Sequence, residues 1–120
     1  MHSQTIEAFI ALGIQKNQLR KERPYAFFAG TLLAGGYVGL GILLIFTLGA
    51  TMPLEVQKLV MGLTFCLALL LVVLAGAELF TGHILYMGLA GLAARMSGRD
   101  ILTSWVLCWL GNLLGSVLVA

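Results

Sequence analysis

The chain has 120 residues, of which 60% are hydrophobic and 10% charged, and its mean hydropathy is +1.01. This composition lies far outside that of soluble domains and predicts an integral membrane protein. The length allows a single small unit of three or four spans, and the net charge of +2 is too small to indicate a nucleic-acid partner.

Residues 1–23 are predicted to form an amphipathic helix on the inner membrane surface. Their apolar positions recur at helical spacing on one face, and polar residues occupy the rest. The apolar face comprises Ile6, Phe9, Ile10, Gly13 and Ile14. Two roles stay open, an interfacial anchor, which the pattern favours, and a plug at the mouth of a transport pathway.

The first predicted span runs from Pro24 to Leu48, a stretch without charge. Pro24 suits a first helical turn, where its missing N–H costs nothing. Gly35 and Gly39 form a small-xxx-small step that permits close helix contact in lipid. Basic residues just before the span predict a cytoplasmic N-terminus by the positive-inside rule; they are Lys16, Arg20, Lys21 and Arg23.

Between Lys58 and Arg95 the only charged residue is Glu78. A continuous helix over residues 59–94 would be roughly 54 Å long at about 1.5 Å per residue, whereas the hydrocarbon core is about 30 Å thick. Two full spans would need more residues, and the turn-like group around Glu78 lies in the middle of the run. We therefore predict a broken helix, 54–77 and 83–96, interrupted over Glu78 to Gly82, whose irregular backbone lines a pathway.

The third predicted span covers residues 101–120. Gly98 is expected to end the preceding helix and Asp100 to cap the next one. Arg95 and Arg99 return the chain to the cytoplasmic side, so residues 24–120 form a transmembrane unit with three crossings. Because the chain stops at Ala120 inside an apolar run, we expect it to be part of a longer polypeptide or a truncated gene product.

Cys66 and Cys108 lie inside apolar runs without partner ligands at metal spacing. Neither a disulfide nor a metal site is predicted, and both thiols are expected to be buried as small apolar groups. The few polar residues contain no nucleophile–base pair, so an enzyme is the least favoured class, and no cofactor is expected.

Two segments resemble the formate/nitrite transporter family: residues 75–83, AGAELFTGH, and residues 109–116, WLGNLLGS. The Thr-Gly-His ending of the first is more similar to the nitrite channel branch than to the formate branch. The resemblance extends from about Pro24 to Ala120. It implies an all-α, aquaporin-like fold, a homopentamer with one pore per protomer, and two inverted repeats of three crossings, of which this chain matches the first.

The resemblance also implies roles for residues around the break. Leu79 and Phe80, completed by Leu69, would form an apolar collar in the substrate pathway, and Phe65 would belong to a second collar nearer the outside. Thr81 would offer its hydroxyl to the anion between the collars. A dry collar penalises an ion more than a neutral acid, which suits passage of a weak acid.

The polar residues of the break have alternative roles. Glu78 either accepts bonds from free backbone N–H groups and shapes the loop, which we favour, or transfers protons. His83 either clasps the loop or exchanges protons in the pathway. Gly82 is expected to shape the loop, and Asn112 to hydrogen-bond across to it. Trp105 and Trp109, four residues apart, are expected to contact a neighbouring protomer.

The function predicted from these features is a proton-linked nitrite channel or transporter in the inner membrane, with lipid and a small anion as its partners. Formate or another small weak acid is the alternative substrate. A truncated membrane scaffold that oligomerises without conducting is the alternative from a different class.

Overall fold

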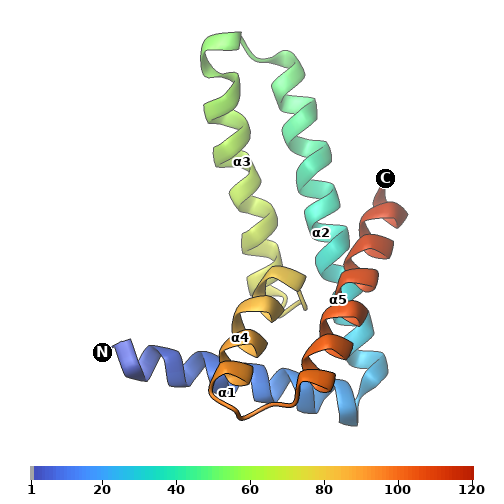
Figure 1. The fold of residues 1–120 in the computed structure, drawn as a ribbon. Helices are drawn as coiled ribbons and strands as arrows, with labels where there is room; N and C mark the ends of the chain where they lie inside the picture. Colours follow the sequence, from blue (N-terminus) through green and yellow to red (C-terminus); the bar gives the residue numbers. More distant parts are fainter. Residues whose placement is uncertain (1) are drawn as a thin grey trace.

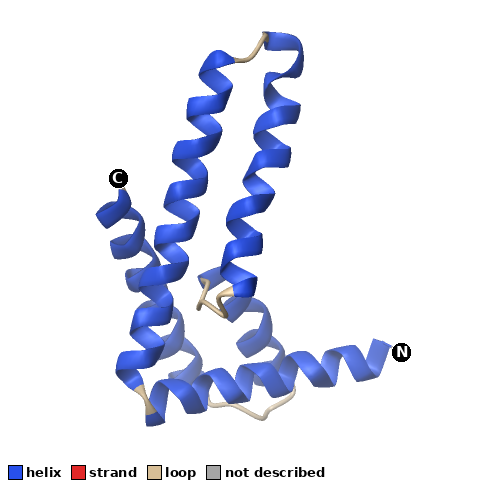
Figure 2. Cartoon of the chain, turned by 180° about the vertical axis from the view of Figure 1, so that it is seen from behind, coloured by secondary structure: helices blue, strands red, loops and turns tan. Residues whose placement is uncertain are grey.

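The computed structural model describes residues 2–120, which form five helices (Figure 1). Within these residues there is no strand (Figure 2). The helices are α1 (His2–Glu22), α2 (Pro24–Thr51), α3 (Leu54–Leu74), α4 (Phe80–Leu92) and α5 (Gly98–Val119). The N-terminal prediction covered residues 1–23, of which Met1 lies outside the described residues.

Helices α2, α3 and α5 are long and apolar enough to cross a membrane, whereas α4 is apolar but shorter. Helix α2 has 28 residues, which corresponds to about 42 Å. It continues to Thr51, three residues beyond the predicted end of the first span. The fold is thus that of an all-α membrane protein.

Helices α2 and α3 form a long antiparallel hairpin, and α4 continues from the lower end of α3 after an irregular segment (Figure 1). Helix α5 runs alongside α2. Helix α1 lies across the end of the molecule at which α4 ends and α5 begins (Figures 1 and 2). The molecule measures 50 × 36 × 21 Å.

Glycines bring α2 and α5 into close contact. A Cβ atom on Gly35 would collide with the carbonyl oxygen of Asn112, and one on Gly115 would collide with that of Leu32. A Cβ on Gly39 would lie 3.2 Å from the Cα of Ser116. The prediction that the Gly35–Gly39 step mediates helix contact is confirmed. Small residues permit this approach because helix association in lipid relies on van der Waals packing.

Helix α1 packs on α4 through part of its apolar face. A Cβ on Gly13 would lie 2.5 Å from the carbonyl oxygen of Tyr86, and Phe9 stacks on the Tyr86 ring with a centroid distance of 5.7 Å. Ile10 is buried, whereas Ile6 is exposed. The face predicted for a membrane surface is therefore partly used within the chain.

Ion pairs join α1 to the turn between α4 and α5. Glu7 pairs with Arg95 at 2.7 Å. Asp100 in the first turn of α5 pairs with Arg20 at 3.0 Å and with Lys21 at 2.7 Å. These contacts connect residues about 80 positions apart, so the helix that begins the chain is attached to its last hairpin.

The predicted break in the second apolar helix is confirmed, but its bounds were wrong. The irregular segment is residues 75–79 rather than Glu78 to Gly82, and α4 starts at Phe80 rather than at residue 83. Gly76 has a φ of +62°, which ends α3 at little cost because glycine has no Cβ. Gly82 therefore lies in the first turn of α4, not in the loop.

The turn before α5 also differs from the prediction. Helix α4 ends at Leu92, and Ala94 adopts a φ of 55°. Ser97 is the N-cap of α5, and its hydroxyl accepts a hydrogen bond from the Asp100 backbone N–H at 3.2 Å. Gly98 is thus the first residue of α5 rather than a terminator, and Asp100 is not the cap. A serine N-cap satisfies a backbone donor that the first turn leaves free.

Replacing Gly115 with alanine should force α2 and α5 apart. We expect the free energy of unfolding to fall by about 2 kcal/mol, the usual cost of overpacking a tight contact. Thermal unfolding in detergent micelles measures the change. Gly62→Ala on α3 is the matched control, because a Cβ there meets no atom within 4 Å. Equal melting temperatures for the two variants would contradict the close packing.

Candidate functional site

The irregular segment between α3 and α4 is held by hydrogen bonds to its backbone. The Glu78 N–H donates to the carbonyl oxygen of Gly30 on α2 at 3.1 Å. Asn112 on α5 donates through its Nδ2 to the carbonyl oxygens of Glu78 (2.9 Å) and Thr31 (2.8 Å), and its Oδ1 accepts from the Phe80 N–H at 2.9 Å. One side chain thus satisfies backbone groups in the break, at the start of α4 and on α2.

Two further side chains of α5 reach the same region. The Cys108 thiol donates to the Glu78 carbonyl oxygen at 3.2 Å, and the Trp105 indole N–H donates to the His83 carbonyl oxygen at 3.1 Å. Trp105, which we expected at a protomer contact, therefore bonds within the chain, whereas Trp109 is exposed. Cys108 is buried as predicted, but the prediction for Cys66 was wrong, because this thiol of α3 is exposed.

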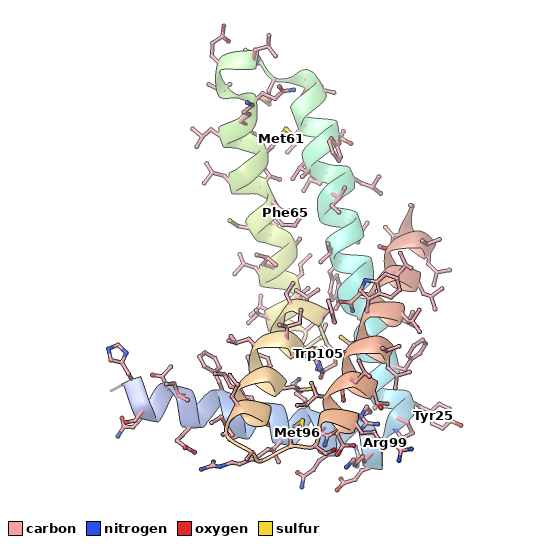
Figure 3. All side chains as sticks on the ribbon, viewed as in Figure 1. Tyr25, Met61, Phe65, Met96, Arg99 and Trp105 are labelled. Carbon is pink, nitrogen blue, oxygen red and sulfur yellow. The ribbon has the colours of Figure 1, made fainter. Side chains whose placement is uncertain are left out.

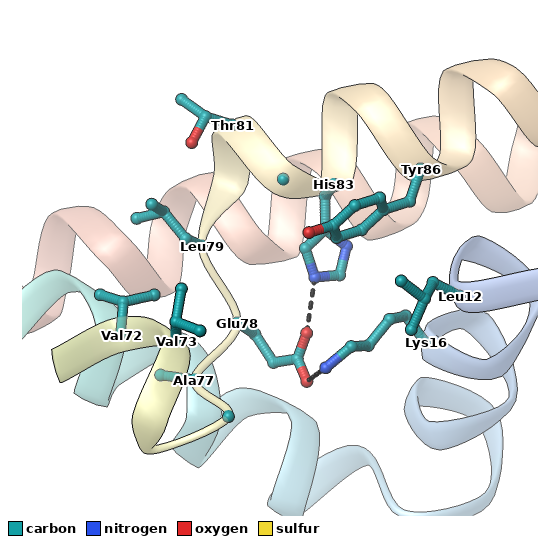
Figure 4. Close-up of a pocket in the computed structure, with 12 residues that line it drawn as sticks. Leu12, Lys16, Val72, Val73, Ala77, Glu78, Leu79, Thr81, His83 and Tyr86 are labelled. Carbon is teal, nitrogen blue, oxygen red and sulfur yellow. Dashed lines mark hydrogen bonds and ion pairs between the residues drawn. The ribbon is translucent and has the colours of Figure 1, made fainter. Parts of the chain in front are cut away.

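A charged cluster lies beside the break (Figure 4). Glu78 pairs with Lys16 of α1 through Oε1 at 2.5 Å and with Nε2 of His83 through Oε2 at 2.8 Å. The side chains of Glu78 and His83 are 4% and 2% exposed, and that of Lys16 is 22% exposed. Because a buried carboxylate needs compensating donors, Lys16 and His83 together make the position of Glu78 tolerable.

Two cavities adjoin the break. The first, of about 350 Å³, is bordered by α1, the end of α3, the break and α4, and its polar lining is Lys16, Glu78, Thr81, His83 and Tyr86. The second, of about 310 Å³, lies between α2, the start of α4 and α5, and is mainly apolar, with Val38, Ile42, Phe80, Trp109 and Leu113. Leu79 and Thr81 line both cavities. The start of α4 therefore lies where the two spaces meet.

The other residues predicted for the pathway lie elsewhere. Phe65 and Leu69 are on α3 and line neither cavity. Leu69 is exposed, and Phe65 is half-buried near Gly41 of α2 (Figure 3). The structure thus brings Leu79, Phe80 and Thr81 together but does not bring Phe65 and Leu69 to them.

Lys16 was not predicted as a site residue, because we assigned it to the basic cluster that sets topology. A signal was present in the spacing of α1. Lys16 lies three residues after Gly13 and one before Asn17, both of which are buried. A lysine on the packed face of a helix needs an acidic partner, and Glu78 is the single acidic residue in the following apolar run.

Comparison with known proteins identifies the family to which this fold belongs. The sequence profile described as formate/nitrite transporter matches residues 3–120. The chain belongs to the formate/nitrite transporter family. A solved structure described as an FNT family ion channel superimposes with a TM-score of 0.92 at 44% identity, covering 98% of this chain and 47% of that channel. The fold is thus about half of the channel fold of this family.

Relatives of both branches are similar to this chain. The nitrite transporter NirC of Salmonella typhimurium is 44% identical over 120 residues, which cover all of this chain and 45% of NirC. The probable formate transporter of Methanothermobacter thermautotrophicus is 44% identical over 95 residues, 75% of this chain and 35% of that protein. The formate channel FocA of Haemophilus influenzae is 31% identical over 102 residues, which cover 82% of this chain and 36% of FocA. The chain therefore spans about half the length of these relatives.

Replacing Asn112 with leucine should destabilise the break. Three hydrogen bonds are lost, and at about 0.6 kcal/mol for each bond in a membrane protein we expect a loss of about 2 kcal/mol in detergent unfolding. Ser116→Ala, one turn later, is the control, since its hydroxyl donates only to Leu113 of its own helix. Equal stability of the two variants would show that the hydrogen bonds of Asn112 do not stabilise the break.

Replacing Lys16 with methionine should leave Glu78 with His83 as its remaining partner. Breaking a buried ion pair by removing one member costs about 3 kcal/mol. The additional substitution Glu78→Gln should recover part of this loss, because it removes the uncompensated charge. A double-mutant cycle of unfolding free energies measures the coupling. Additive effects would show that the two side chains do not interact.

Proposed function

We propose that this chain forms part of a membrane channel or transporter for nitrite or its conjugate acid. The observation that supports this most is the shared wall of the two cavities, where Leu79 and Thr81 border both spaces. Non-helical backbone within a membrane domain is typical of transport sites. Nitrite is our first candidate because NirC of Salmonella typhimurium is similar to the whole chain.

The proposed pathway passes from one cavity to the other beside the start of α4. Leu79 and Phe80 form an apolar collar there, and the Thr81 hydroxyl offers a hydrogen bond to the permeant. Loss of hydration in an apolar collar disfavours an anion far more than a neutral acid. We infer that a proton accompanies the anion through the collar, and that Phe65 and Leu69 form apolar surface further along α3.

Lys16 gives the first cavity a partly exposed cation. An ammonium group at its wall attracts a small anion, and Glu78 offsets the charge so that the anion is not held too tightly. This combination favours entry of nitrite into the cavity without trapping it. Conduction requires binding strong enough for entry and weak enough for exit.

The proposed setting is a bacterial-type inner membrane, with residues 1–23 on the cytoplasmic side and residues 24–120 as the transmembrane unit. Six of the seven lysines and arginines lie at the α1 end of the chain's spans, which favours this orientation. We further propose a homo-oligomer, a pentamer by the family resemblance. The chain corresponds to about half the length of these relatives, so a complete pathway needs lining residues beyond those of this chain.

Formate is the second candidate substrate. The formate channel FocA of Haemophilus influenzae and the probable formate transporter of Methanothermobacter thermautotrophicus are both similar to this chain. Formate and nitrite are both small monovalent anions of weak acids, and the collar does not distinguish them by charge. Competition between the two anions in one flux measurement would rank them.

Nitrite uptake into proteoliposomes tests the proposal. The natural protein should carry nitrite, and Thr81→Val should lower the flux by about fivefold, which corresponds to about 1 kcal/mol for one hydrogen bond. Thr64→Val is the matched control, because the Thr64 hydroxyl donates to Val60 within α3. Absence of nitrite and formate flux from the natural protein would refute transport. Equal nitrite flux through the two variants would show that the Thr81 hydroxyl does not contact the permeant.

A further inference from the structure

We propose that His83 is a positioning residue, which holds Glu78 against Lys16 through its Nε2–H and does not relay protons to the permeant. The inference rests on the proposed transport function, because it concerns the wall of the first cavity. A histidine in a channel would ordinarily be taken as a proton carrier. The hydrogen bonds and burial of His83 favour a different role.

The Nε2 atom carries the proton that binds Glu78. One carboxylate oxygen of Glu78 accepts from the Lys16 ammonium, and the other lies 2.8 Å from Nε2. A carboxylate bound to an ammonium accepts hydrogen bonds with both oxygens. The ring must therefore donate, so Nε2 carries a proton.

The Nδ1 atom has no hydrogen-bond partner among residues 2–120 and is fully buried. The Phe27 ring of α2 covers the imidazole in a T-shaped contact with a centroid distance of 5.5 Å. The titratable groups around the cluster are Lys16 from α1, Glu78 from the break and Tyr86 from α4 (Figure 4). From α5, the Cys108 thiol bonds to the Glu78 carbonyl oxygen. None of these groups hydrogen-bonds to Nδ1 in the described part of the chain.

A proton relay needs a donor on one side of the ring and an acceptor on the other. His83 has a partner on one side only, and its side chain is 2% exposed within this chain alone. A second proton on Nδ1 would create a buried N–H without an acceptor, which is costly. The most exposed member of the cluster is Lys16, whose side chain is 22% exposed.

Two substitutions separate positioning from proton relay in the natural protein. The amide of His83→Gln can occupy the Nε2 position and donate to Glu78 but cannot titrate, whereas His83→Asn is too short to do so. Nitrite flux of H83Q should stay within about twofold of the native value between about pH 5 and 8, and H83N should lose about tenfold. His2→Gln, at an exposed position of α1, should match the native protein throughout.

Several outcomes would overturn the inference. It fails if H83Q loses as much flux as H83N, or if H83Q abolishes the pH dependence that the native protein has. It also fails if H83N transports as well as the native protein, because the position of Glu78 would then not depend on His83.

Nitrogen-15 NMR of labelled histidine gives a readout that does not depend on transport. The resonance that disappears in H83Q should show a ring with the proton on Nε2 and none on Nδ1. A proton on Nδ1 of that ring would overturn the inference. If the natural protein carries neither nitrite nor formate, the proposed function fails, and the NMR result alone decides the role of His83.

Discussion

The structure depends on satisfying backbone hydrogen bonds where a helix is interrupted among apolar elements. Helices suit membranes because their backbone groups hydrogen-bond within the helix. The segment between α3 and α4 is not helical and lacks part of this internal hydrogen bonding. Asn112 replaces part of what is lost by bonding to Glu78 in the break and to Phe80 at the start of α4, and Gly30 accepts from the Glu78 N–H. The irregular backbone that lets Leu79 line both cavities is possible because neighbouring helices supply these partners.

The same requirement explains why α2 and α5 are so closely packed. Asn112 bonds simultaneously to the Thr31 carbonyl of α2 and to the break, which is possible only when the two helices nearly touch. A Cβ on Gly111 would collide with the Thr31 side chain. The glycines of the two helices therefore serve the site as well as the fold, since a wider separation would leave the amide out of reach.

The sequence predicted the interruption but not its limits or its ionic partner. The length of the run between Lys58 and Arg95, with Glu78 in its middle, was enough to require a break. Its position depended on Gly76, whose backbone conformation ends α3, and the prediction emphasised Gly82 instead. The pairing of Glu78 with Lys16 joins residues 62 positions apart. Local periodicity could mark Lys16 as a lysine on a packed face, but it does not show where two segments so far apart in the sequence meet, so the first cavity could not be derived from it.

The ion pairs of α1 have a consequence for the order of biosynthesis. A ribosome makes α1 before the other described helices, and Arg95, the partner of Glu7, follows 88 residues after it, with Asp100 later still. These ion pairs of α1 can therefore form only after α2, α3 and α4 have been made. The attachment of α1 through these ion pairs is a late step of maturation. The ion pair between Lys16 and Glu78 likewise forms only after the interrupted helix has been made.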